Sequence, residues 1–168
     1  MSENDIDYTP AVLRNKGIPC EFAVAVRGED DWVKKYDDTV GDFEKEIRHI
    51  RFNHNAIAYI EDMWDGLNKW QEALEIKPVS TLRKTLAILL TVTVDEIGAM
   101  MIEGRLAEYN NAIGVAWAIA NGVDPTVAGR LLEQTKLTVD TQLTVINKEM
   151  ESLIETLEEI EDIPGDQQ

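Results

Sequence analysis

The chain has 168 residues, which is enough for one domain with a sizeable core. Its 16 basic and 32 acidic residues give a formal charge of −16, and because such a surface repels nucleic acid and anionic membranes, we expect neither as a partner. A single cysteine, Cys20, excludes an internal disulfide and most thiolate metal sites. The first residues lack the basic and apolar regions of a signal peptide, so we expect a cytoplasmic protein.

The first part of the chain contains an irregular segment and then an alternating one. Residues 1–19 are polar and show no sustained period, so we expect a flexible N-terminal arm. Phe22, Val24 and Val26 alternate with other residues, and this two-residue period predicts a half-buried strand over residues 20–27. After a polar turn, residues 32–36 predict a second short strand.

Residues 40–52 allow two interpretations. Ile50 and Phe52 lie two residues apart, which favours a strand over residues 48–52. Val40, Phe43, Ile47 and Ile50 also recur at helical spacing, which favours a helix. Period alone does not decide between them; we favour the strand over residues 48–52, and residues 20–52 are predicted as a small β element.

The whole pattern predicts a mainly α fold: a compact core over residues 20–123, with the β element at residues 20–52 and helices at residues 53–122, and then a long C-terminal helix. Asn53 or Asn55 can cap the first helix by accepting a backbone hydrogen bond. Gly66 offers the left-handed conformation that ends or bends this helix. Pro78 ends the second helix, and Ser80 starts the third.

Two more helices complete the predicted core. Thr93 with Glu96 fits a capping box, and Gly104 and Gly122 close the last two helices. The large apolar residues of the core share helix faces: Ile57, Ile60, Trp64, Leu67, Trp70, Leu74, Leu82, Leu86, Leu89, Leu90, Ile97, Met100, Met101, Leu106, Tyr109, Ile113, Trp117 and Ala120.

Residues 124–168 predict a long acidic C-terminal helix and a tail. Asp124-Pro125 is a strong helix start, and we expect helix over residues 126–163. Apolar residues then alternate spacings of four and three over about three heptads, which is typical of a coiled-coil seam: Val139, Leu143, Ile146, Met150, Leu153, Leu157 and Ile160.

The charges beside this seam limit its partners. After Lys148 the chain has no basic residue, and its acidic side chains repel one another. Pairing with a more basic helix is therefore favoured over pairing with a second copy. In the alternative interpretation, the seam packs back on residues 53–122 as the last helix of a bundle, and its acidic side is an ordinary solvated face.

No catalytic, cofactor-binding or metal-binding constellation stands out. His49 and His54 are the only histidines, and their spacing fits no metal-binding motif. The sequence has no glycine-rich phosphate loop. We therefore expect no enzymatic activity and no cofactor, and Cys20 is most simply a small buried side chain.

Two interpretations apply to four large residues of the predicted core. Trp64, Trp70, Met100 and Met101 suit an adaptable apolar groove for a protein client. Their helical spacing favours burial in the core instead. The candidate partner-binding residues are these four, together with four residues of the C-terminal seam: Leu143, Met150, Leu153 and Leu157.

The order of helix caps and apolar stripes over residues 52–122 is similar to that of a known protein family. This order comprises Phe52-Asn53, Ala56, Ile60-Glu61, Gly66, Lys77-Pro78, Arg83 with Leu86 to Leu90, Asp95-Glu96 with Gly98, and an alanine-rich helix that ends in glycine. It resembles the tail assembly chaperones of long-tailed, siphovirus-like bacteriophages. Members of that family are small, acidic, mainly helical proteins with a little β structure near the N-terminus.

The resemblance implies a function in virion assembly. The protein would bind the tape measure protein and keep it soluble in the host cytoplasm, and it would not remain in the mature virion. Many members also have a longer form made by a programmed frameshift, which implies the tail tube protein as a further partner, and a homo-oligomer is a further alternative. The competing interpretation is an acidic helical adaptor or regulatory module, unrelated to tails, that assembles through its C-terminal seam.

Overall fold

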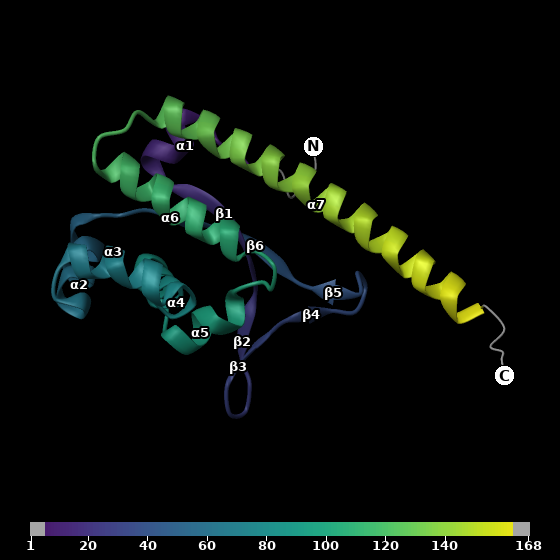
Figure 1. Ribbon diagram of the computed structural model, residues 1–168. Helices are drawn as coiled ribbons and strands as arrows, with labels where there is room; N and C mark the ends of the chain where they lie inside the picture. Colours follow the sequence, from purple (N-terminus) through teal and green to yellow (C-terminus); the bar gives the residue numbers. More distant parts are fainter. Residues whose placement is uncertain (1–5, 163–168) are drawn as a thin grey trace. The chain divides into compact units, whose positions relative to one another are not determined.

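The described part of the chain is mainly α, as the sequence predicts. The computed structural model describes residues 6–162, without the side chains of residues 136, 138–140, 143, 161 and 162. The chain divides into two units, Met1–Leu132 and Glu133–Gln168. The described residues form seven helices and three short antiparallel strand pairs (Figure 1). None of these helices has the length and apolar character that crossing a membrane requires.

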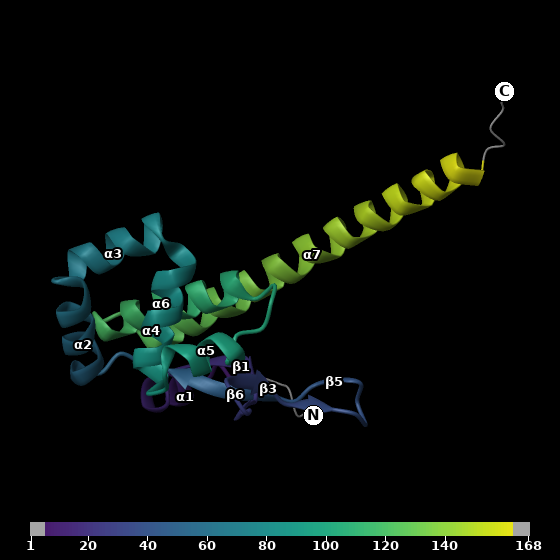
Figure 2. The same ribbon diagram turned by 90° about the horizontal axis from the view of Figure 1, so that it is seen from below.

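Five helices follow one another in the middle of the chain: α2 (His54–Trp64), α3 (Leu67–Ile76), α4 (Pro78–Leu90), α5 (Val94–Met100) and α6 (Leu106–Ala120). The chain turns sharply between α2, α3 and α4 (Figure 2). The Asn53 side chain caps α2 by accepting the Ala56 N–H at 2.8 Å. The Thr93 hydroxyl caps α5 by accepting the Glu96 N–H at 3.0 Å. The Thr93 cap was predicted from the sequence, and Asn53 is one of the two residues predicted for the first cap.

Two predicted helix boundaries are wrong in detail. Asp65, not Gly66, adopts the left-handed conformation that ends α2, with φ 58° and ψ 43°. Gly66 has φ 127° and turns the chain into α3. α4 begins at Pro78 rather than at Ser80, because proline is well suited to the first helical position, where no N–H is needed.

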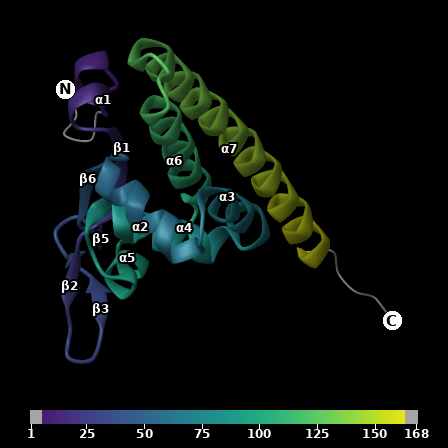
Figure 3. The same cartoon turned by 90° about the vertical axis from the view of Figure 1, so that its left-hand side faces the viewer.

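The strands form three two-stranded antiparallel ribbons: β1 (Ile18–Ala23) with β6 (Lys45–Ile50), β2 (Ala25–Arg27) with β3 (Trp32–Lys34), and β4 (Tyr36–Asp37) with β5 (Asp42–Phe43). The register of the first ribbon places Ile18 opposite Ile50. β3 packs against α5, and in Figure 3 the loop that joins β2 to β3 points away from the helices.

These ribbons meet at a closed ring of backbone hydrogen bonds. The N–H of Val24 donates to the carbonyl of Glu44 at 2.8 Å, and the N–H of Glu44 donates to the carbonyl of Lys35 at 2.8 Å. The N–H of Lys35 closes the ring by donating to the carbonyl of Val24 at 2.7 Å. Each chain segment changes its pairing partner at this ring. Residues 42–43 and 45–50 are therefore strands, and the helical interpretation of residues 40–52 is wrong.

The N-terminal segment contains a helix that the sequence analysis missed. α1 spans Pro10–Asn15, and its Leu13 is only 2% exposed. The prediction of a flexible arm over residues 1–19 is thus incorrect for α1 and for the first residues of β1, whereas residues 1–5 lie outside the described part. Likewise, β1 is buried along its whole length instead of on one face, because α1, α5 and α6 all pack against it.

Tyr109 links α6 to β1 in the middle of the core. Its ring is fully buried and stacks on Phe22, with ring centroids 4.7 Å apart. Its hydroxyl donates to the Glu21 carbonyl at 2.9 Å and accepts the Ile102 N–H at 3.1 Å. The Arg105 guanidinium lies 3.3 Å from the Glu21 carboxylate. Burial raises the pKa of the Tyr109 hydroxyl to about 12, so the hydroxyl keeps its proton at neutral pH.

α7 spans Pro125–Asp162 and belongs to both units. The Asp124 carboxylate accepts the Thr126 N–H at 2.8 Å, as expected of a helix cap. In the first unit, Ala128 and Leu132 on this helix are buried. In the second unit, all described residues, 133–162, are helical. The helix was predicted over residues 126–163, of which residue 163 lies outside the described part.

Candidate partner-binding site

Trp70 and Met100 belong to the core, which supports the core interpretation of these two residues over the partner-binding one. Trp70 is 1% exposed and Met100 is 2% exposed. The Trp70 ring meets Phe52 and Trp117 edge to face, with centroids 5.8 and 5.2 Å away. Its indole N–H donates to the Thr85 hydroxyl at 3.0 Å. Every polar and apolar part of this side chain therefore has a partner inside the protein.

Trp64 and Met101 are partly buried and pack against the same core. With Trp70 and Met100 buried beneath the surface, the four residues do not form one exposed groove. Their helical spacing already favoured the core interpretation. What the sequence could not indicate was the extent of burial, because that depends on which other helices cover each face.

The second half of α7 presents a continuous apolar surface, which we call the α7 face. Met150, Leu153 and Leu157 were predicted from the heptad pattern, and each is 52% exposed. Ile154, beside the predicted seam, was missed and is 50% exposed. Leu143, the remaining predicted residue, lies on α7, but its side chain is outside the described part. The α7 face consists of Ile146, Met150, Leu153, Ile154, Leu157 and Ile160, all at least half exposed.

Five exposed glutamates accompany the α7 face, and we call them the glutamate flank: Glu149, Glu151, Glu155, Glu158 and Glu159. In the described part of the chain, none of the seven ion pairs includes one of them. The same helix carries Thr141 and Thr156, whose hydroxyls donate to carbonyls one turn earlier at 2.8 and 2.9 Å. These bonds satisfy the threonine hydroxyls within the helix itself.

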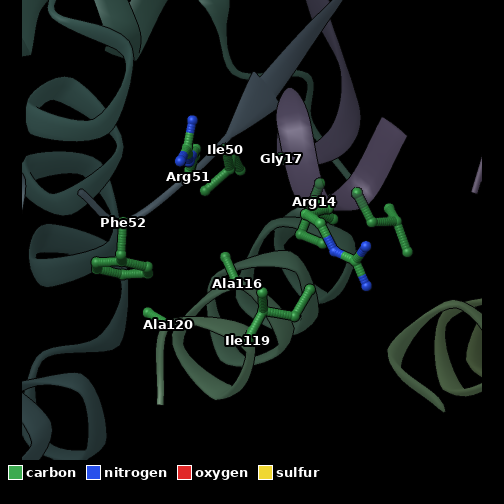
Figure 4. Close-up of a pocket in the computed structure, with 10 residues that line it drawn as sticks. Arg14, Gly17, Ile50, Arg51, Phe52, Ala116, Ile119 and Ala120 are labelled. Carbon is green, nitrogen blue, oxygen red and sulfur yellow. The ribbon is translucent and has the colours of Figure 1, made fainter. Parts of the chain in front are cut away.

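A small cleft lies between α1, the end of β6 and α6 (Figure 4). Arg14 and Arg51 border it, and the Arg51 guanidinium donates to the Asn15 carbonyl at 3.3 Å. Gly17, with φ 106°, lets the chain pass close to the Ile50 carbonyl, with which a Cβ would collide. The remaining lining is apolar: Leu13, Ile18, Phe52, Ala116, Ile119 and Ala120. With a volume of about 160 Å³, the cleft is smaller than typical small-molecule pockets.

This cleft was not predicted from the sequence. Arg14 and Arg51 are far apart along the chain, and they approach the same opening only because β1 pairs with β6. Pairing of this kind leaves no signal in a local pattern of residues. The size of the cleft argues against a cofactor or an extended client segment as its occupant.

Burial shifts the pKa of two titratable groups in the described part of the chain. Burial raises the pKa of the Cys20 thiol, which disfavours the reactive thiolate. Burial also lowers the pKa of His49, and the nearby charge of Lys16 adds to this shift. Among the side chains that the structure describes, no three of His, Cys, Asp or Glu gather in a way that could hold a metal ion.

Comparisons with known protein families, with curated proteins and with solved structures gave no match for this chain.

Proposed function

We propose that this protein is a tail assembly chaperone of a long-tailed bacteriophage, which binds the tape measure protein and keeps it soluble during tail assembly. The observation that carries the proposal is the α7 face, a continuous apolar surface on a strongly acidic helix. An exposed apolar stripe of this kind is typical of a surface that associates with another protein. A helix can occupy it by aligning its own apolar face along the seam.

The charge of the protein supports a solubilising role. A tape measure protein is long and rich in apolar helix, and before assembly it exposes surface that promotes aggregation. A partner with a formal charge of −16 would cover part of that surface and add net charge to the complex. Net charge opposes the association of complexes with each other, so a client bound to this protein would stay in solution.

The resemblance over residues 52–122 supports the same function. Two positions that contribute to it take part in helix caps. The Asn53 side chain accepts a backbone N–H, and the Glu96 backbone N–H donates to the Thr93 hydroxyl. Pro78, another position of the resemblance, occupies the first position of α4. In this proposal, the compact core and its N-terminal β element carry the long C-terminal helix that presents the client-binding surface.

The remaining parts of the proposal concern partners and location. The protein acts in the host cytoplasm, has no enzymatic activity and needs no cofactor, because holding an apolar client requires only complementary surface. A longer, frameshifted form would extend the same core toward the tail tube protein. In the phage genome, a major tail protein gene upstream and a very long reading frame downstream would agree with this function.

Co-expression with the protein encoded by that long reading frame tests the proposal. We expect the client to pellet when expressed alone, and to remain soluble and co-purify when this chain is present. Because the contact is mainly apolar, the complex should survive moderate salt, which screens charges over about 8 Å. If the client stays insoluble and no complex forms at low or high salt, while another protein co-purifies, the adaptor function replaces the chaperone function.

A further inference from the structure

The α7 face runs along one side of a helix. Five of its residues, all except Ile154, recur at alternating spacings of four and three, so they stay on one side of α7 over about four turns, and Ile154 widens that side. Their side chains are 50 to 57% exposed, which leaves about half of each available for contact. An amphipathic helix binds such a surface by placing its own apolar residues between them. The chemistry of the partner is then decided by the charges that border the face.

The glutamate flank has a definite arrangement around α7. At 3.6 residues per turn, Glu149 borders the α7 face on one side, and Glu151 and Glu158 border it on the other. Glu155 and Glu159 lie on the opposite side of the helix. The sequence contains no basic residue after Lys148 that could neutralise these borders. A helix docked on the α7 face would therefore meet negative charge on both of its sides.

We infer that the α7 face binds an amphipathic helical segment of the client whose apolar stripe is bordered by Lys or Arg. The inference rests on the proposed function only in taking the client as the source of that helix. Basic side chains at the borders would pair with Glu149 on one side and with Glu151 and Glu158 on the other. A second copy of α7 would instead bring a second glutamate flank to the same interface, with no basic border residue to offset it.

Synthetic peptides test the inference on the full-length protein. The first probe is a fluorescein-labelled amphipathic helix of 21 residues with Leu and Ile on one stripe and Lys at the borders. The second has the same stripe with Glu at the borders, and the third is a scrambled form of the first. Binding is measured by fluorescence anisotropy at low and high salt, and the oligomeric state of the free protein is measured by sedimentation equilibrium.

We expect the Lys-bordered peptide to bind about tenfold more tightly than the Glu-bordered one at low salt, since several exposed charge pairs each contribute modestly. The difference should shrink at high salt, because such pairs are screened. A Glu149→Lys, Glu151→Lys, Glu158→Lys variant should prefer the Glu-bordered peptide. A Glu29→Lys, Asp38→Lys, Glu72→Lys variant, with the same change in charge on the first unit, should keep the original preference.

Three results would overturn the inference. One is equal affinity for the Lys-bordered and the Glu-bordered peptide. Another is binding of the scrambled peptide as tightly as the Lys-bordered one. The third is a stable homo-oligomer that the Leu153→Asp, Leu157→Asp variant breaks, with no peptide bound. If the client stays soluble in the co-expression test while the peptides fail, only this inference fails. If the peptides discriminate as expected while the client aggregates, the proposed function fails and the helix-binding surface remains.

Discussion

Replacing Tyr109 with Phe tests how the first unit is held together. The substitution keeps the buried ring, which stacks on Phe22, and removes only the hydroxyl. The Glu21 carbonyl, which is buried, and the Ile102 N–H, which is part-buried, then lose their partner. An unsatisfied buried group costs about 1–3 kcal/mol, and water reduces the cost at the more open N–H, so we expect a loss of about 2–4 kcal/mol.

The measurement is the free energy of unfolding from urea denaturation, followed by tryptophan fluorescence. The expected loss corresponds to a fall in Tm of roughly 6–12 °C for a unit of this size. Tyr59→Phe is the matched control, because Tyr59 is 66% exposed and its hydroxyl should contribute less than about 0.5 kcal/mol. A loss at Tyr109→Phe no larger than that of the control would refute the idea that this hydroxyl joins α6 to β1.

Three further predictions concern other parts of the first unit. Thr85→Val should cost about 1–3 kcal/mol in urea unfolding, because the buried indole N–H of Trp70 loses its acceptor, and an unchanged midpoint would contradict this. Gly17→Ala should cost about 2 kcal/mol or more, because φ is 106° and the new Cβ would collide with the Ile50 carbonyl; a stable Ala variant with an unchanged Tm would refute it. The folded-state pKa of His49 is lowered by burial, so the unfolded state binds the proton more readily, and the His49 contribution to stability should fall as pH drops through about 6.5 and below. His49→Gln should remove that component from unfolding curves measured between about pH 7.5 and pH 5.5, and an unaltered pH dependence would contradict this assignment.

Local signals predicted the helical part of the fold well. Residue type and spacing narrowed the first cap to Asn53 or Asn55 and indicated Thr93 for the later one, and the Asn53 and Thr93 side chains make capping bonds. Capping depends on side chains and N–H groups within one helical turn, so a short stretch of sequence contains the needed information. Helical spacing likewise predicted that Ile60, Leu86 and Ile97 lie inside, and all three are buried.

Apart from the two helix boundaries near Gly66 and Ser80, which are local errors, the failures depend on contacts between distant parts of the chain. Leu13 and β1 are buried because helices from later in the sequence pack on them, which the local period cannot reveal. The ring formed by Val24, Lys35 and Glu44 decides that residues 42–50 pair as strands around that junction, although their spacing also fits a helix. Similarly, the candidate partner-binding residues could be divided into core and surface only after their burial was known.

The solubility of the client in the presence of α7 variants tests the central claim most directly. The test variant is Leu153→Asp, Leu157→Asp, which adds two charges to the α7 face. The control is Thr141→Asp, Ser152→Asp, which adds the same charge at exposed polar positions of the same helix. In both variants the first unit should unfold at the same urea concentration as in the wild type, because none of the four replaced side chains is buried.

The soluble fraction of the co-expressed client is then measured for the wild type and for both variants. We predict that the wild type and the control keep the client soluble, whereas the client pellets with the Leu153→Asp, Leu157→Asp variant. A client that remains as soluble with this variant as with the wild type would contradict the claim that the α7 face holds it.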